Sequence, residues 1–172
     1  MSERAEQKAV RPVCMIVAIF GWFSVAVFGA DWPQWRGVER LAEWSETGIV
    51  DKLPDDLLVR WRMPIRSGYS GPAVADGRVF VTDWGEDSES RTLDGTERAI
   101  ALDEHTGAVL WTHEWTTSYR MLQVSYAVGP RATPTVDENR VYVVGATGRL
   151  FCFGVETGKA LWEKDYVAEY GT

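Results

Sequence analysis

Two stretches of the chain, Ala101-Leu-Asp-Glu-His-Thr-Gly-Ala-Val-Leu-Trp111 and Cys152-Phe-Gly-Val-Glu-Thr-Gly-Lys-Ala-Leu-Trp162, align without a gap. Both contain Thr-Gly followed four residues later by Trp, and they lie 51 residues apart. Self-similarity at a period of this length is the signature of repeat architectures, in which each unit buries its faces against its neighbours. The chain is therefore expected to consist of stacked repeats.

A second match lies upstream within each copy. Pro72-Ala-Val-Ala-Asp-Gly-Arg-Val-Phe-Val81 aligns on Pro134-Thr-Val-Asp-Glu-Asn-Arg-Val-Tyr-Val143 at a spacing of 62 residues, so the earlier copy carries eleven extra residues. These fall between Trp84 and Arg98, where the acidic run beginning at Glu86 predicts a solvated hairpin. Trp61, fifty residues before Trp111, is expected to end a preceding unit. The predicted units lie near 31–66, 67–116 and 130–166.

Each unit is predicted to hold four short strands. In the second copy these cover 133–137, 140–144, 149–153 and 160–165, separated by Glu138-Asn139, Gly145-Ala-Thr-Gly148 and Thr157-Gly158. Enrichment in β-branched and aromatic residues, with turn signals every eight to twelve residues, favours an all-β fold. A period near 50 with four strands is typical of a β-propeller blade. The predicted fold is thus an incomplete propeller of about two and a half blades after an N-terminal apolar helix.

The Thr-Gly-x-x-x-Trp pattern has a structural explanation. Glycine accepts a positive φ in the turn, and Asp and Thr side chains bond backbone groups of the same turn. The large Trp ring can then bury against the neighbouring blade, with its N–H bonded to an acceptor. The residues assigned to blade docking are Trp61, Ala101, Asp103, Thr106, Gly107, Trp111, Thr157, Gly158 and Trp162.

The first thirty residues have the pattern of a targeting segment. Arg4, Lys8 and Arg11 precede an uncharged stretch from 12 to 30 that ends in Gly29-Ala30. Charged, apolar and small residues in that order are typical of a secretory signal peptide. The alternative is a retained membrane anchor, because the apolar run is close to the roughly 20 residues that span a bilayer. Either interpretation predicts an exported protein, periplasmic or extracellular.

The composition excludes several classes of protein. The 172 residues include 18 Lys and Arg against 25 Asp and Glu, a net charge of −7. An acidic chain argues against nucleic-acid binding, which needs clustered basic residues. Two cysteines cannot form a disulfide scaffold, and only Cys152 lies beyond the targeting segment.

The pattern Ala-x-Asp-x-x-Thr-Gly-x-x-x-Trp, complete from Ala101 to Trp111, resembles the tryptophan-docking motif of pyrroloquinoline-quinone-type repeats. The second copy departs from it, with Cys152 for Ala and Gly154 for Asp. The opening Asp31-Trp-Pro-Gln-Trp-Arg-Gly37 and the run from Ser67 to Pro72 are similar to the start of secreted members of this group. The resemblance covers about residues 31–172. It implies an eight-bladed propeller, found both in quinoprotein alcohol dehydrogenases and in non-enzymatic relatives, including a lipoprotein of outer-membrane β-barrel assembly.

The resemblance does not extend to catalytic residues. Quinoprotein dehydrogenases hold their cofactor with a metal ion and carboxylates near the propeller axis, and no catalytic or metal-binding position can be matched here. Arg131 precedes an expected innermost strand and is the one candidate contact for a cofactor or ligand. His105 and His113 are expected to be structural. No cofactor is therefore expected, and pyrroloquinoline quinone is expected only in a complete propeller.

The sequence leaves three functional hypotheses. The first is an exported, non-catalytic binding or scaffold module whose partner is another protein or further blades, with membrane contact only through an uncleaved N-terminal segment. The second is the N-terminal part of a quinone-dependent alcohol or sugar dehydrogenase, and the third is an outer-membrane protein assembly factor. Since closed propellers need about four to eight blades, the chain is expected to be part of a longer propeller or the product of a shortened reading frame.

Overall fold

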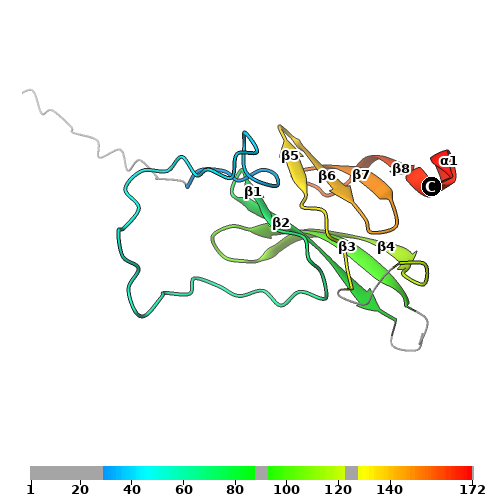
Figure 1. The fold of residues 1–172 in the computed structure, drawn as a ribbon, viewed down its shortest axis with the longest axis horizontal. Helices are drawn as coiled ribbons and strands as arrows, with labels where there is room; N and C mark the ends of the chain where they lie inside the picture. The colour runs from blue at the N-terminus through cyan, green and yellow to red at the C-terminus, as the bar shows by residue number, and fades with distance from the viewer. Residues whose placement is uncertain (1–28, 88–92, 123–127, 172) are drawn as a thin grey trace, which may run out of the picture.

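The computed structural model describes residues 29–87, 93–122 and 128–171, which form two four-stranded antiparallel sheets (Figure 1). The first sheet contains β1 (Ala73–Ala75), β2 (Arg78–Glu86), β3 (Asp94–Asp103) and β4 (Val109–Ser118), in that order. The second contains β5 (Thr135–Asp137), β6 (Arg140–Val144), β7 (Arg149–Gly154) and β8 (Ala160–Asp165). The predicted all-β fold with four-stranded blades is confirmed, and the two sheets are called blade 1 and blade 2 below.

The two blades share details of strand pairing. Phe80 lies opposite Ala101 in blade 1, and Tyr142 lies opposite Cys152 in blade 2. The pairing of the third and fourth strands shifts after Ala101 in one blade and after Cys152 in the other. Equivalent positions of the sequence repeat therefore occupy equivalent positions in the two sheets.

The eleven extra residues of the first copy lengthen its central hairpin. β2 and β3 have 9 and 10 residues, whereas β6 and β7 have 5 and 6. The insert pairs Trp84 with Glu97 and Glu86 with Gly95, so both of its ends continue the sheet. The predicted solvated tip, residues 88–92, lies outside the described residues, as does the predicted apolar helix of the targeting segment up to residue 28.

The main core lies between the two blades. It joins Phe80, Ala101 and Trp111 of blade 1 with Phe151 and Phe153 of blade 2, all at most 8% exposed. The other face of blade 1 is a smaller cluster of Val81, Ile100 and Leu102, which the side chains of Trp61 and Met63 cover. Figure 1 shows the blades side by side with the short strands β1 and β5 adjacent.

The N-terminal part differs from the partial blade expected near 31–66. Among residues 29–72, the structure contains isolated bridges, Trp32 with Val74 and Ser67 with Trp84, but no strand. A strand needs a neighbouring strand for its backbone groups, and Leu57, Leu58 and Val59 instead lie exposed in the long loop of Figure 1. Among the described residues, two blades form as sheets, and the expected partial blade contributes no strand.

A short helix, α1 (Tyr166–Tyr170), follows β8 and was not predicted. The Asp165 side chain caps its start by accepting from the Ala168 N–H at 3.0 Å, and Gly171 ends it with a φ of 69°. No helix among the described residues is long and apolar enough to cross a membrane.

Candidate functional site at the blade interfaces

Trp61 and Trp111 make equivalent hydrogen bonds one blade apart. The Trp61 Nε1–H donates to the Glu104 carbonyl oxygen at 2.8 Å. The Trp111 Nε1–H donates to the Val155 carbonyl oxygen at 2.7 Å. Both acceptors lie at the same repeat position, in the turn between the third and fourth strands. Each Trp thus links the segment that precedes a blade to the turn between the third and fourth strands of that blade.

The glycine of each Thr-Gly turn lies directly beneath the Trp ring. A Cβ on Gly107 would come within 2.6 Å of the Trp61 ring, and a Cβ on Gly158 within 2.5 Å of the Trp111 ring. Both glycines also have positive φ, 71° and 64°. The turn therefore requires glycine for two separate reasons, backbone conformation and the close approach of an indole.

These two reasons can be separated by experiment. Gly158→Ala should lower the free energy of unfolding by about 3 kcal/mol or more, because it adds left-handed backbone strain and displaces Trp111. Gly77→Ala is the matched control, because Gly77 has a φ of 68° but no atom within 4 Å of its Cβ position. It should cost only about 1–2 kcal/mol. Equal losses in urea unfolding would show that the Trp111 contact adds nothing.

The Asp and Thr of the motif stabilise the turn of blade 1. Asp103 Oδ1 accepts from the Thr106 N–H at 2.7 Å, from the Thr106 hydroxyl at 2.7 Å and from the His105 N–H at 3.1 Å. The hydrogen bond from the Thr106 hydroxyl is the main reason that the pKa of Asp103 lies below its usual value. In blade 2, Gly154 replaces Asp and offers only its backbone: its carbonyl oxygen accepts from the N–H groups of Thr157 and Gly158, as the Asp103 carbonyl oxygen accepts from Gly107.

Trp162 occupies the same repeat position as Trp111 in a different environment. Trp111 is 8% exposed, whereas Trp162 is 41% exposed. Its ring lies 6.0 Å from Tyr142, just as the Trp111 ring lies 5.9 Å from Phe80. Tyr142, Leu150 and Trp162 define the far face of blade 2. This face is equivalent, by position in the repeat, to the face of blade 1 that packs against blade 2.

A second contact between the blades was missed by the sequence analysis. Glu97, on the lengthened β3, is fully buried and joins both blades. Its carboxylate accepts from the Trp115 Nε1–H at 2.7 Å, from the Tyr119 hydroxyl at 2.5 Å and from the Ala146 N–H at 2.9 Å. A Cβ on Gly145 would lie 2.4 Å from Glu97 Oε2, so the turn of blade 2 needs glycine there. Burial, reinforced by Glu97, raises the pKa of Tyr119.

An ion pair lies next to Glu97 in the same hairpin. Arg98 binds the fully buried Asp83 with two hydrogen bonds, at 2.8 Å and 2.6 Å, and the Arg66 N–H donates to the same carboxylate at 2.8 Å. The hydrogen bond to Asp83 raises the pKa of Arg98. The insert that was predicted to be a solvated hairpin thus contributes the buried Glu97 at its base, and the buried Asp83 lies just before it.

Comparison with known proteins agrees with this architecture. The sequence model of the family described as outer membrane protein assembly factor BamB matches residues 55–129 and 95–172. The chain belongs to this family of PQQ-like repeat proteins. The two matches overlap along the chain, as expected when a repeat is matched more than once.

Individual PQQ-like relatives are similar over part of their length. The outer membrane protein assembly factor BamB of Nitrosomonas eutropha is 31% identical over 74 residues, which are 43% of this chain and 18% of that protein. Two solved structures each cover 62% of this chain. A europium-containing methanol dehydrogenase matches with a TM-score of 0.41, 22% identity and 19% of its own length covered. BamB from Moraxella catarrhalis matches with a TM-score of 0.31 and 18% identity, and 36% of its own length is covered. The chain therefore spans at most about a third of these proteins.

The described PQQ-like repeats do not assemble a recognisable cofactor site. Arg131, the candidate contact, is exposed and precedes β5. Its positive charge opposes the rise in the pKa of Tyr119 that burial causes. In the described parts of the chain, no three His, Cys, Asp or Glu side chains lie together as metal ligands. The described residues therefore offer no ligand set that fits a metal-bound quinone.

His113 is expected to make the stability of the interface between the PQQ-like blades depend on pH. Its ring lies 4.6 Å from Phe153 and 5.5 Å from Phe151, and partial burial lowers its pKa below the ordinary 6.5. The unfolded chain therefore takes up this proton first, so stability should fall as the pH drops below about 6.5. His113→Gln should flatten the decline in urea unfolding between pH 7.5 and 5.5. The exposed His105→Gln should keep it, and identical profiles for both variants would contradict the assignment.

Proposed function

We propose that this chain is a non-catalytic binding or scaffold module, exported from the cytoplasm, that docks protein partners on the far face of blade 2. The PQQ-like propeller repeats and the family membership provide the scaffold. Two parts of the proposal go beyond family membership: that the partner is a protein, and that the chain lies outside the cytoplasm.

The exposure of Trp162 carries this proposal. Trp61 and Trp111 each lie against the turn of the following blade, whereas the far face of blade 2 presents an indole and a phenol that no other described residues cover as a blade. An amphipathic ring with an N–H donor is well suited to a protein interface, because it supplies both apolar area and one directed hydrogen bond. The partner should therefore offer an apolar surface with a backbone carbonyl, as the turn of a further blade does.

The location outside the cytoplasm has two supports. The first is the order of charged, apolar and small residues in positions 1–30. The second is the description of the matching family and of the Nitrosomonas relative as outer membrane protein assembly factors. A role in outer-membrane protein assembly is the specific form of this proposal that the relatives favour.

The test is site-specific crosslinking of the full chain in the native cell, followed by fractionation. A photoreactive phenylalanine analogue would replace Trp162 in one variant and Thr112, exposed on β4 of blade 1, in another. We expect a crosslinked protein species from position 162 in the periplasmic or membrane fraction, and none from position 112. Equal crosslinking at both positions, no crosslinking at either, or a cytoplasmic location would overturn the proposal.

A further inference from the structure

A cavity lined by indoles lies on the N-terminal side of the blades, away from the far face of blade 2. It has a volume of about 600 Å³, and its walls include Trp32, Trp35 and Trp44, together with Pro72 and Val74. Trp35 is 65% exposed and Trp44 is 57% exposed. Clustered exposed apolar surface of this kind marks interaction sites.

The segment that carries these indoles is held by both blades. Trp32 exchanges two backbone hydrogen bonds with Val74 of β1, at 2.8 Å and 2.9 Å. The Pro33 carbonyl oxygen accepts from the Val136 N–H of β5 at 2.7 Å. The opening Asp31-Trp-Pro-Gln-Trp motif thus bridges the first strands of the two blades, and the cavity has a fixed floor.

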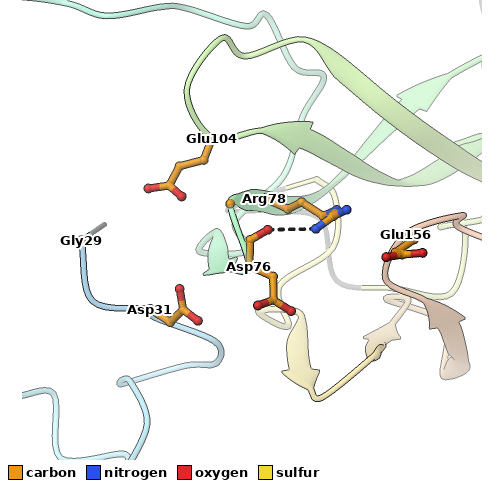
Figure 2. A pocket seen from close by; sticks show the side chains of 7 residues that line it. Gly29, Asp31, Asp76, Arg78, Glu104 and Glu156 are labelled. Carbon is orange, nitrogen blue, oxygen red and sulfur yellow. Dashed lines mark hydrogen bonds between the residues drawn. The ribbon is translucent and has the colours of Figure 1, made fainter. Parts of the chain in front are cut away.

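A second cavity, of about 700 Å³, is acidic. Its walls carry the carboxylates of Asp31, Asp76, Glu104 and Glu156, which come from four different segments. Figure 2 shows Asp31, Asp76 and Glu104 around one opening, with Glu156 beyond Arg78. Within the described residues, none of these four carboxylates has a hydrogen-bond or ion-pair partner. The Arg78 guanidinium donates to the Asp76 carbonyl oxygen at 2.8 Å and leaves the carboxylates unpaired.

The two cavities are adjacent. Gly29 and Glu104 line both of them, so the acidic part lies directly beside the indole-lined part. Each part alone has the volume of a small-molecule site, and together they exceed the usual upper limit for one. An extended ligand, rather than a compact one, therefore matches the groove in size.

We propose that this groove binds an extended polypeptide segment that carries basic side chains next to an aromatic or aliphatic one. The unpaired carboxylates complement Lys or Arg, and the indoles take the apolar side chain. Arg36 lines the same cavity and stacks on Trp35, with its guanidinium carbon 5.5 Å from the ring centroid. The groove is separate from the far face of blade 2, so peptide binding in the groove and docking on that face can each fail independently.

The test measures peptide binding to the full 172-residue chain by fluorescence anisotropy. The probe is a labelled, end-capped peptide of alternating Lys and Phe, and its control alternates Glu and Phe. We expect the Lys-Phe peptide alone to bind, and to weaken as salt rises from 50 to 300 mM. Equal binding of both peptides, or binding of neither, would overturn the proposal.

Two pairs of variants locate the binding. Trp35→Ala should weaken it about tenfold, whereas Tyr170→Ala, at the same 65% exposure on α1, should not change it. Asp31→Asn with Glu104→Gln should also weaken it about tenfold. Asp51→Asn with Asp55→Asn removes the same two charges from the exposed loop and should leave binding unchanged. Equal effects within either pair would contradict the groove as the binding site.

Three further results would assign the groove to another occupant and overturn the proposal. The first is binding that appears only after Arg4, Lys8 and Arg11 are all changed to Gln, which would indicate the chain's own N-terminal segment. The second is self-association that Trp35→Ala abolishes, which would indicate a second copy. The third is displacement of the peptide by tetramethylammonium at equal concentration, which would indicate a small organic cation.

Discussion

Replacing Trp111 with Ala is expected to lower the free energy of unfolding by about 3–5 kcal/mol, the usual cost of truncating a buried Trp. Trp111 packs between Phe80 and Phe153, with ring centroids 5.9 Å from each, and covers Gly158. Its N–H also holds the Val155 carbonyl oxygen. The loss therefore combines a cavity between the blades with an unsatisfied carbonyl group.

Trp162→Ala is the matched control for this prediction. The two residues occupy the same repeat position and differ in burial, 8% exposed for Trp111 against 41% for Trp162. In urea unfolding of the isolated chain, Trp162→Ala should cost about 1 kcal/mol, close to the average for any substitution. If Trp111→Ala cost no more than Trp162→Ala, the interface between the blades would not depend on the indole.

Glu97→Ala should be the second large effect, a loss of about 2–4 kcal/mol. Removing the carboxylate leaves the Trp115 N–H, the Tyr119 hydroxyl and the Ala146 N–H without their acceptor in a dry interface. Relief of the cost of burying a charge offsets part of this loss. Two of the donors belong to blade 1 and one to blade 2, so the variant should also loosen the contact between the blades.

Glu97→Gln tests whether the acceptor atoms or the bulk of the side chain matter. Its amide keeps one acceptor oxygen but presents an NH₂ group to donors that need an acceptor, so its stability should fall between wild type and Glu97→Ala. The control is Glu114→Gln on the neighbouring strand β4, where the exposed carboxylate lies 3.9 Å from Arg66. That change should stay within about 0.5 kcal/mol. Equal urea-unfolding midpoints for Glu97→Ala and Glu114→Gln would show that the Glu97 carboxylate does not stabilise the contact between the blades.

The strands and turns of the blades could be predicted because their signals are local. The alternation around Val79–Val81 and Val141–Val143 needs only a strand, and the Thr-Gly pairs need only a turn with a positive φ. The partial blade near 31–66 could not be judged in this way. Its Leu57-Leu-Val-Arg-Trp61 run has strand composition. In the described structure, however, Arg60 and Trp61 contact the turn of the following blade through their side chains, and no strand lies beside the run.

The burial of Glu97 between the blades could not be predicted from a local sequence pattern. A lone Glu in a polar run normally predicts a solvated face, and its burial depends on Trp115, Tyr119 and Ala146, which lie 18 to 49 residues away. The one sequence sign was indirect: an insert that lengthens a hairpin must continue along the sheet before it turns. In the structure its base lies against the turn of the neighbouring blade, where the Ala146 N–H donates to Glu97.

The sequence by itself determined the repeat, the four strands of each blade, the turn glycines and the family. The tertiary structure decided which of three equivalent Trp residues are covered, where a carboxylate is buried and that the opening motif bridges two blades. The physical reason is that backbone periodicity and turn conformation depend on near neighbours in the chain. Burial and charge complementarity depend instead on the segment that lies across in space, which for Trp111 and Glu97 is a separate blade.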